Sequence, residues 1–202
     1  MNKVQHRPHV GRDYEQGISG RRVAIMGFSH HDDDLSTDSA GATEECLAKV
    51  IAGEHPETQF FRQISSYFGD DKDQFWSRVL FFNFLPRAVD RAGRGRYRDG
   101  TFDEVQVARE RFLEIVHQHK PDMLFVLSEK AWPSLPPSIE DQEGKAGDRF
   151  LAGETFERHH YRTSEGHVVQ VIGLRHPQGA RKESMMQGVA AAMQLRPGAS
   201  AG

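Results

Sequence analysis

The sequence has few of the features that mark several classes of protein. Cys46 is the only cysteine, so the chain forms no internal disulfide and no cysteine-rich zinc site. No run of about 18 apolar residues occurs, so no segment is expected to span a membrane, and the polar start of the chain does not look like a secretory signal. Neither sign of charge dominates, because 26 Lys and Arg face 29 Asp and Glu. We therefore expect a soluble, cytoplasmic protein whose overall charge does not mark it as a nucleic-acid binder.

The chain divides into one domain and two short ends. A length of 202 residues suits a single hydrophobic core. Residues 1–20 are polar and unpatterned, which predicts an N-terminal arm that is either mobile or wrapped along an edge. Residues 21–195 carry the domain, and residues 196–202 are expected to be a frayed tail.

Four short apolar runs indicate strands, and the first three are continuous rather than alternating, as in a parallel sheet buried on both faces. Helical patterns separate them, and in one of these Thr101 and Glu104 have the spacing of a capping box. This alternation predicts an α/β fold, a three-layer α/β/α sandwich with a central four-stranded parallel sheet. The expected strands are 22–28, 78–84, 122–128 and 167–174, and the expected helices are 39–53, 57–68, 101–121 and 180–195.

Polar residues gather where these strands end, which is where open α/β sheets bind ligands. Gly27 ends the first strand and is followed by "FSHHDDD" (28–34). Asn83 lies in the second strand, where an apolar residue is expected, and its amide either ties two loops together or reads the edge of a base. The third strand leads into "SEKAW" (128–132), and the fourth leads into "RHPQGARK" (175–182).

Residues 29–34 could form a metal site or, with Ser29, part of a hydrolase site, and their spacing bears on both interpretations. His30, His31 and the three following Asp residues are metal-ligand types, but adjacent side chains point in different directions and rarely converge on one ion. The preferred interpretation is that these residues form the polar rim of a pocket or an anionic cluster at a helix N-terminus. Ser29 and His176 could act as a nucleophile and its base, yet neither a GxSxG motif nor a DxxH pairing accompanies them.

Two further segments carry positive charge. The loop at 87–100 contains five Arg residues and three Gly residues, and it either follows a phosphate backbone or is an ordinary solvated loop. In "RHPQGARK", Pro177 sets a stiff turn and Gly179 allows close backbone approach before the last helix. Such a loop can hold a phosphodiester, although an ordinary turn explains it equally well.

Taken together, these segments resemble the uracil-DNA glycosylase superfamily. The order matches that family: a Gly-rich motif after the first strand, an Asn in the second, and His-Pro after the last. The counterparts here are "GFSHH" (27–31), "LFFNFLPRA" (80–88) and "HPQGA" (176–180). A little-characterised bacterial branch with motifs such as "GESHY", "PDxvlvlGxxxW" and "HPS" is more similar still, since this chain has "PDMLFVLSEKAW" at 121–132. The resemblance covers roughly residues 22–185.

This resemblance implies base excision from DNA, in which a damaged or deaminated base is flipped into a pocket and its N-glycosidic bond is cleaved. It implies that His176 stabilises the departing base and that Asn83 reads it, with Phe28 and Gly27 beside it. It implies that Ser29 or His30, with Asp32, positions water, and that phosphate is contacted by Arg175, Gln178, Arg181 and Lys182. DNA or a nucleotide is the expected partner. No metal or other cofactor is expected, because no cysteine set for an iron–sulfur cluster exists.

The motifs also depart from the family pattern. Ser29 stands where the family carries an Asp, and Gln178 stands where Ser is usual, so excision is expected to be weak, altered or lost. One alternative is a non-catalytic protein that binds a nucleotide or small ligand in the same pocket. The other is a Ser29/His176 hydrolase.

Overall fold

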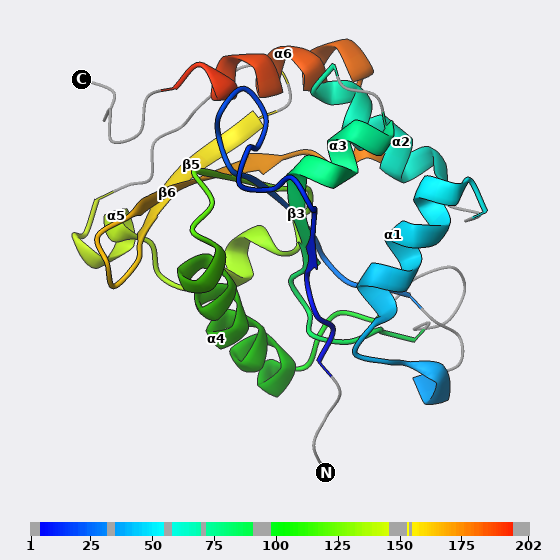
Figure 1. The fold of residues 1–202 in the computed structure, drawn as a ribbon. Coiled ribbons are helices and arrows are strands. Elements are labelled where there is room, and N and C mark those ends of the chain that lie inside the picture. The colour runs from blue at the N-terminus through cyan, green and yellow to red at the C-terminus, as the bar shows by residue number, and fades with distance from the viewer. Residues whose placement is uncertain are drawn as a thin grey trace.

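The computed structural model describes residues 5–31, 35–54, 58–69, 72–90, 98–145, 153 and 155–195. It is a mixed α/β fold (Figure 1). Its strands form one six-stranded sheet in the order β1-β3-β2-β4-β6-β5. None of the described helices is both long and apolar enough to cross a bilayer.

The four expected strands form the centre of the sheet. They are β2 (Val23–Gly27), β3 (Val79–Asn83), β4 (Met123–Val126) and β6 (Val168–Leu174). Each runs parallel to its neighbours within this group. Nearly all of their residues are buried, as expected for strands covered on both faces.

The expected four-stranded parallel sheet is the centre of a larger, mixed sheet of six strands. Antiparallel strands flank the centre, with β1 (His9–Val10) beside β3 and β5 (Thr155–Arg162) beside β6. Neither has an apolar run, since β1 has only two residues and β5 reads TFERHHYR. An edge strand gains much of its stability from backbone pairing, so hydrophobic periodicity does not reveal it.

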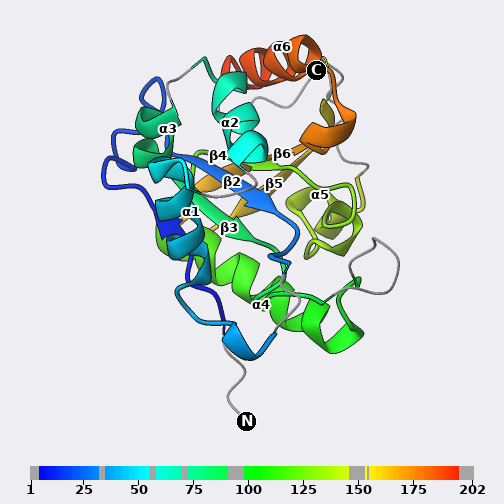
Figure 2. The same ribbon diagram turned by 90° about the vertical axis from the view of Figure 1, so that its right-hand side faces the viewer.

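Helices pack on both faces of the sheet (Figure 2). One face carries α1 (Ala42–Ala52), α2 (Thr58–Tyr67), α3 (Lys72–Arg78) and α6 (Lys182–Met193). The other carries α4 (Phe102–His119), and α5 (Ile139–Gln142) contacts β5. Successive residues of β2 alternate between the two resulting cores, with Ile25 in one and Met26 in the other, because strand side chains alternate in direction.

The first turn of α4 confirms the predicted capping box. The Glu104 backbone N–H donates to Thr101 Oγ1 at 3.3 Å, and the Glu104 carboxylate accepts from the Thr101 backbone N–H at 2.8 Å. These contacts satisfy donors that a helix N-terminus leaves open. The helix therefore begins at a fixed point directly after the loop at 98–101.

Residues 5–20 lie along the edge formed by β3. The Gly11 N–H donates to the Val79 carbonyl at 2.9 Å, and Tyr14 is buried. Arg111 of α4 is also buried, and its guanidinium donates to the carbonyls of His6 at 2.5 Å and Asn83 at 2.8 Å. One side chain thus joins the N-terminal segment to the carboxyl end of β3.

Candidate functional site: a pocket at the carboxyl ends of the parallel strands

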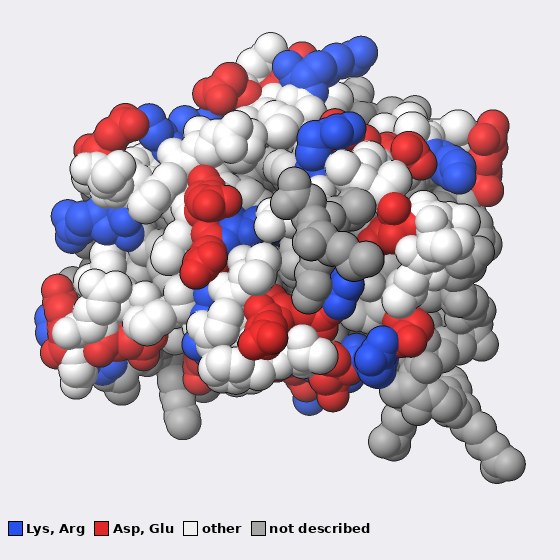
Figure 3. Space-filling model, turned by 90° about the horizontal axis from the view of Figure 1, so that it is seen from below, with Lys and Arg blue, Asp and Glu red and all other residues white. Residues whose placement is uncertain are grey.

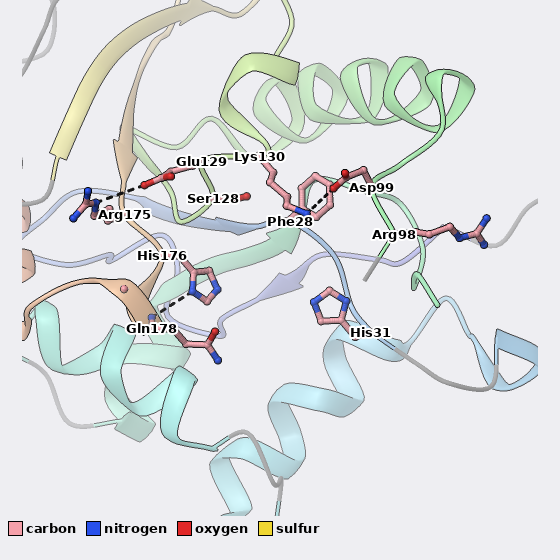
Figure 4. A pocket seen from close by; sticks show the side chains of 11 residues that line it. Phe28, His31, Arg98, Asp99, Ser128, Glu129, Lys130, Arg175, His176 and Gln178 are labelled. Atoms are coloured by element: carbon pink, nitrogen blue, oxygen red, sulfur yellow. Dashed lines mark hydrogen bonds and ion pairs between the residues drawn. The ribbon is translucent and has the colours of Figure 1, made fainter. Parts of the chain in front are cut away.

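A pocket of about 1100 Å³ lies at the edge of the sheet where the parallel strands end (Figure 4). The segments after β2, β4 and β6 and the loop before α4 all contribute to its wall. The lining residues are Phe28, His31, Arg98, Asp99, Ser128, Glu129, Lys130, Arg175, His176, Gln178 and Gly179. Residues far apart in the sequence therefore meet at the edge that the sequence predicted.

His176 projects into the middle of this pocket (Figure 4). It precedes a short 3-10 turn at Pro177–Gly179, and its Nδ1 accepts from the Gln178 backbone N–H at 3.3 Å. One face of the ring stacks on Phe60 of α2, with ring centroids 5.4 Å apart. This partial burial lowers the pKa of His176 below its usual 6.5, although Glu129 acts in the opposite direction. At neutral pH the ring is therefore uncharged, and the acceptor role of Nδ1 places its proton on Nε2.

The cations of the pocket wall are paired with carboxylates. Lys130 Nζ lies 2.6 Å from Asp99 Oδ1, and Arg175 Nε lies 3.6 Å from Glu129 Oε1. Arg98 is bonded to Asp90 at 2.5 Å. These pairs are largely exposed, and exposed pairs of this kind contribute about 0–1 kcal/mol each. An anionic ligand can therefore replace a carboxylate at modest cost.

Phe28 supplies the aromatic surface of the pocket. Lys130 Nζ stands over its ring at 5.8 Å from the centroid. Ser128, at the start of the same segment, is buried, and its hydroxyl accepts from the Ala131 N–H at 3.1 Å. The turn after β4 is thereby held in place, and Lys130 projects across the ring of Phe28.

Asn83 and Gly27 are neighbours at the ends of β3 and β2. They form the last register pair of the two strands, and the Asn83 Oδ1 occupies the space that a Cβ on Gly27 would fill. Asn83 is buried, and its backbone carbonyl is held by Arg111. Neither Asn83 nor Gly27 is on the pocket wall itself, so the two residues lie at the strand ends behind it.

The three residues after Phe28 face in different directions. His30 Nε2 lies 2.9 Å from Thr43 Oγ1 of α1, and its ring packs edge-on against His6. The hydroxyl of Ser29 is buried with no hydrogen-bond partner among the described residues, so it does not pair with His176. His31 is the one that lines the pocket.

Some of the remaining residues that were predicted to form the site line the pocket, and others do not. Arg175 and Gln178 line the pocket, whereas Arg181 and Lys182 are exposed at the start of α6 and do not. Asp32 lies outside the described residues, as do the three arginines at 91, 94 and 96 of the basic loop. Within the part of the chain that is described, no group of three or more His, Cys, Asp or Glu side chains is arranged to hold a metal ion.

Several wall residues were not singled out from the sequence. Glu129 and Lys130 belong to the segment after the third strand, whose position was a usable signal. Asp99 belongs to the loop at 87–100, which was considered for its arginines. Behind the wall, Phe60 lies in the helix expected at 57–68, and nothing in the spacing of α2 shows that it stacks on His176.

Comparison with protein-family models gives no match, and comparison with curated protein sequences gives none either.

Proposed function

We propose that the pocket receives a nucleobase turned out of DNA and promotes cleavage of its N-glycosidic bond, as in a uracil-DNA-glycosylase-like protein. The observation that carries this proposal is the position and hydrogen bonding of His176. An uncharged ring on the pocket wall, with Nδ1 accepting from the Gln178 N–H and Nε2 left as a donor, suits a leaving group that becomes negative.

The reaction needs such a donor. As the bond from the base nitrogen to the sugar C1′ breaks, both electrons go to the base, and C1′ becomes electron-poor. A hydrogen bond from His176 Nε2–H to a carbonyl oxygen of the base stabilises the developing anion more than it stabilises the intact nucleotide. Water then adds its oxygen to C1′, and its released proton neutralises the base anion.

Other residues supply binding and water. Phe28 offers a ring to the base once Lys130 moves from its face. Asn83 lies behind the pocket wall, so its amide can offer a donor and an acceptor to the base only if the strand ends open. The unpartnered Ser29 hydroxyl is suited to hold a water molecule near the strand ends. Because Ser29 carries no charge, it stabilises the electron-poor sugar less than a carboxylate would, and we expect slow turnover.

The test is base release from oligonucleotides that carry uracil, hypoxanthine or xanthine. We expect His176→Ala to slow release by about 100-fold or more, because one lost oxyanion donor costs about 2.7–4 kcal/mol. His117→Ala, which changes an exposed histidine of α4, is the matched control and should leave the rate unchanged. Equal rates for wild type and His176→Ala would remove His176 from the chemistry.

A second candidate function is binding of a nucleoside or nucleotide without excision. It is favoured by the pairing of the three wall cations with carboxylates, which leaves less charge for a phosphate backbone. On the face shown in Figure 3, the described Lys and Arg side chains also lie among Asp and Glu. This function predicts ligand affinity with weak salt dependence, whereas DNA binding predicts a steep decrease in affinity as salt rises.

A further inference from the structure

Phe60 connects the histidine of the pocket to the hydrophobic core. It lies in the first turn of α2, and its ring stacks on the imidazole of His176 with the two planes at 26° and the centroids 5.4 Å apart. Phe60 is not among the residues that line the pocket. Any effect of Phe60 on a ligand in the pocket is therefore exerted through His176.

A row of aromatic rings holds Phe60 in place. Phe60 is partly buried against the core, and its ring meets Phe61 edge-on with centroids 5.1 Å apart. Phe61 is buried, and it contacts Trp76 of α3 and Phe81 of β3 at 5.7 and 5.8 Å between centroids. Edge-on pairs at such separations are favourable. The row runs from the sheet to the pocket, so His176 stacks on a fixed surface.

Two contacts define the state of the histidine. The Gln178 N–H donates to its Nδ1 at 3.3 Å, which leaves the ring proton on Nε2. Phe60 covers one face of the ring and excludes water from it, and loss of water disfavours the charged form of a histidine.

The charged groups near the ring do not explain its low pKa. Burial lowers the pKa of His176, whereas the charge of Glu129 raises it. Glu129 is itself paired with Arg175 at 3.6 Å, and α2 contacts the ring through Phe60, which carries no charge. The other titratable residues of the wall are His31, Arg98, Asp99 and Lys130. Apolar cover is therefore the cause of the lowered pKa.

We propose that Phe60 is a positioning residue, which covers one face of His176 and thereby keeps the ring an uncharged donor with a fixed orientation. Its effect on base release rests on the proposed function, whereas its effect on the ring does not. In the protonated ring both nitrogens carry hydrogen, so Nδ1 can no longer accept from the Gln178 N–H. The apolar cover therefore also preserves the hydrogen bond that orients the ring.

The test follows the protonation of His176 by NMR as the pH is lowered, with no ligand present. The imidazole signal is assigned by its absence in His176→Gln. We expect Phe60→Ala to raise the pKa of His176 to about 6.5 or above, because the ring face becomes hydrated while the charge of Glu129 remains. Phe60→Leu should keep the pKa near the wild-type value, because a large apolar side chain still covers the ring.

Phe68→Ala is the matched control. Phe68 follows α2 and is also a partly buried phenylalanine packed against the same core. Its ring contacts Phe75 and Phe125, at 5.0 and 5.2 Å between centroids. Phe68→Ala should therefore remove a similar amount of packing and leave the pKa of His176 unchanged.

The pH dependence of base release gives a second measurement. A histidine with the ordinary pKa of about 6.5 is only about one-tenth uncharged at a pH of about 5.5. We therefore expect release by Phe60→Ala to fall about tenfold or more between about pH 8 and pH 5.5, with a smaller fall in the wild type and in Phe68→Ala. Lost packing alone would slow release by the same factor at every pH.

The outcomes separate this inference from the proposed function. A raised pKa of His176 in Phe60→Ala supports the role of Phe60 even if the wild type releases no base, a result that would refute excision alone. An unchanged pKa in Phe60→Ala would overturn that role even if the wild type releases base. An equal rise in Phe60→Leu or Phe68→Ala would also overturn it, because the effect would then not come from the cover that Phe60 provides.

Discussion

The contact between Gly27 and Asn83 leads to a prediction that can be worked through from the structure. A methyl group on Gly27 would overlap the Oδ1 of Asn83, whereas the next side chain, Phe81, would be 3.9 Å away at its Cζ. The clash therefore comes from the amide alone. Overpacking of a buried site costs about 1–3 kcal/mol, so we expect Gly27→Ala to destabilise the protein by about 2 kcal/mol.

The same substitution should cost almost nothing once the amide is removed. In an Asn83→Ala background the new methyl group meets only Phe81 at an ordinary contact distance. The reduced freedom of the unfolded chain on replacing Gly with Ala, worth about 0.4–1 kcal/mol, then favours the folded state. We expect Gly27→Ala to be neutral or slightly stabilising in that background, which gives a coupling free energy of about 2 kcal/mol or more between the two positions.

Urea unfolding of the wild type, both single variants and the double variant measures this coupling. A difference of 2 kcal/mol corresponds to roughly 4–8 °C in melting temperature for a chain of this size, so thermal unfolding is an independent check. Equal destabilisation by Gly27→Ala in both backgrounds would refute the reasoning, because it would show that something other than the Asn83 amide requires glycine.

Three further predictions concern side chains around the pocket. Partial burial lowers the pKa of His176 below 6.5, so the unfolded chain binds more protons there as the pH falls below 6.5. As the pH falls from 7 to 5, the free energy of unfolding of the wild type, measured by urea titration, should therefore decrease more than that of His176→Gln. The same pH dependence in both proteins would show that the ring is not buried. Arg111→Met should lower the free energy of unfolding by about 2–4 kcal/mol, because two buried carbonyls lose their donor. Limited proteolysis should also cut residues 5–20 faster in this variant. An unchanged cleavage rate would show that Arg111 does not hold the N-terminal segment in place. Thr101→Ala should lower the free energy of unfolding by about 1 kcal/mol, measured by thermal unfolding, whereas Thr101→Ser should not lower it. Equal stability of Thr101→Ala and the wild type would show that the capping box contributes nothing.

Much of the fold could be predicted because its signals are local. The residues of β2, β3, β4 and β6 are apolar enough to identify buried strands, and the Thr101–Glu104 spacing located the start of α4. The edge strand β5 could not be predicted in the same way. Its Arg158 and His160 are buried, and burial of polar or charged side chains depends on partners that only the folded chain brings near.

The site was predictable at the level of segments and less so at the level of side chains. The strand ends that were expected to meet do meet, and His176 lies in the pocket between them. Which of Ser29, His30 and His31 faces the pocket depends on non-local hydrogen bonds, such as that from the Val89 N–H to the His30 carbonyl. No spacing rule within the motif contains that information.

Base release by the wild-type protein tests the central claim most directly. Oligonucleotides carrying uracil, hypoxanthine or xanthine are incubated with protein, and free base and abasic strand are measured by mass spectrometry. The proposed function predicts that at least one substrate yields equal amounts of both products, and that the yield falls about 100-fold in His176→Ala. Intact oligonucleotides across the whole set, under conditions in which the protein binds them, would contradict excision and leave the pocket as a binding site.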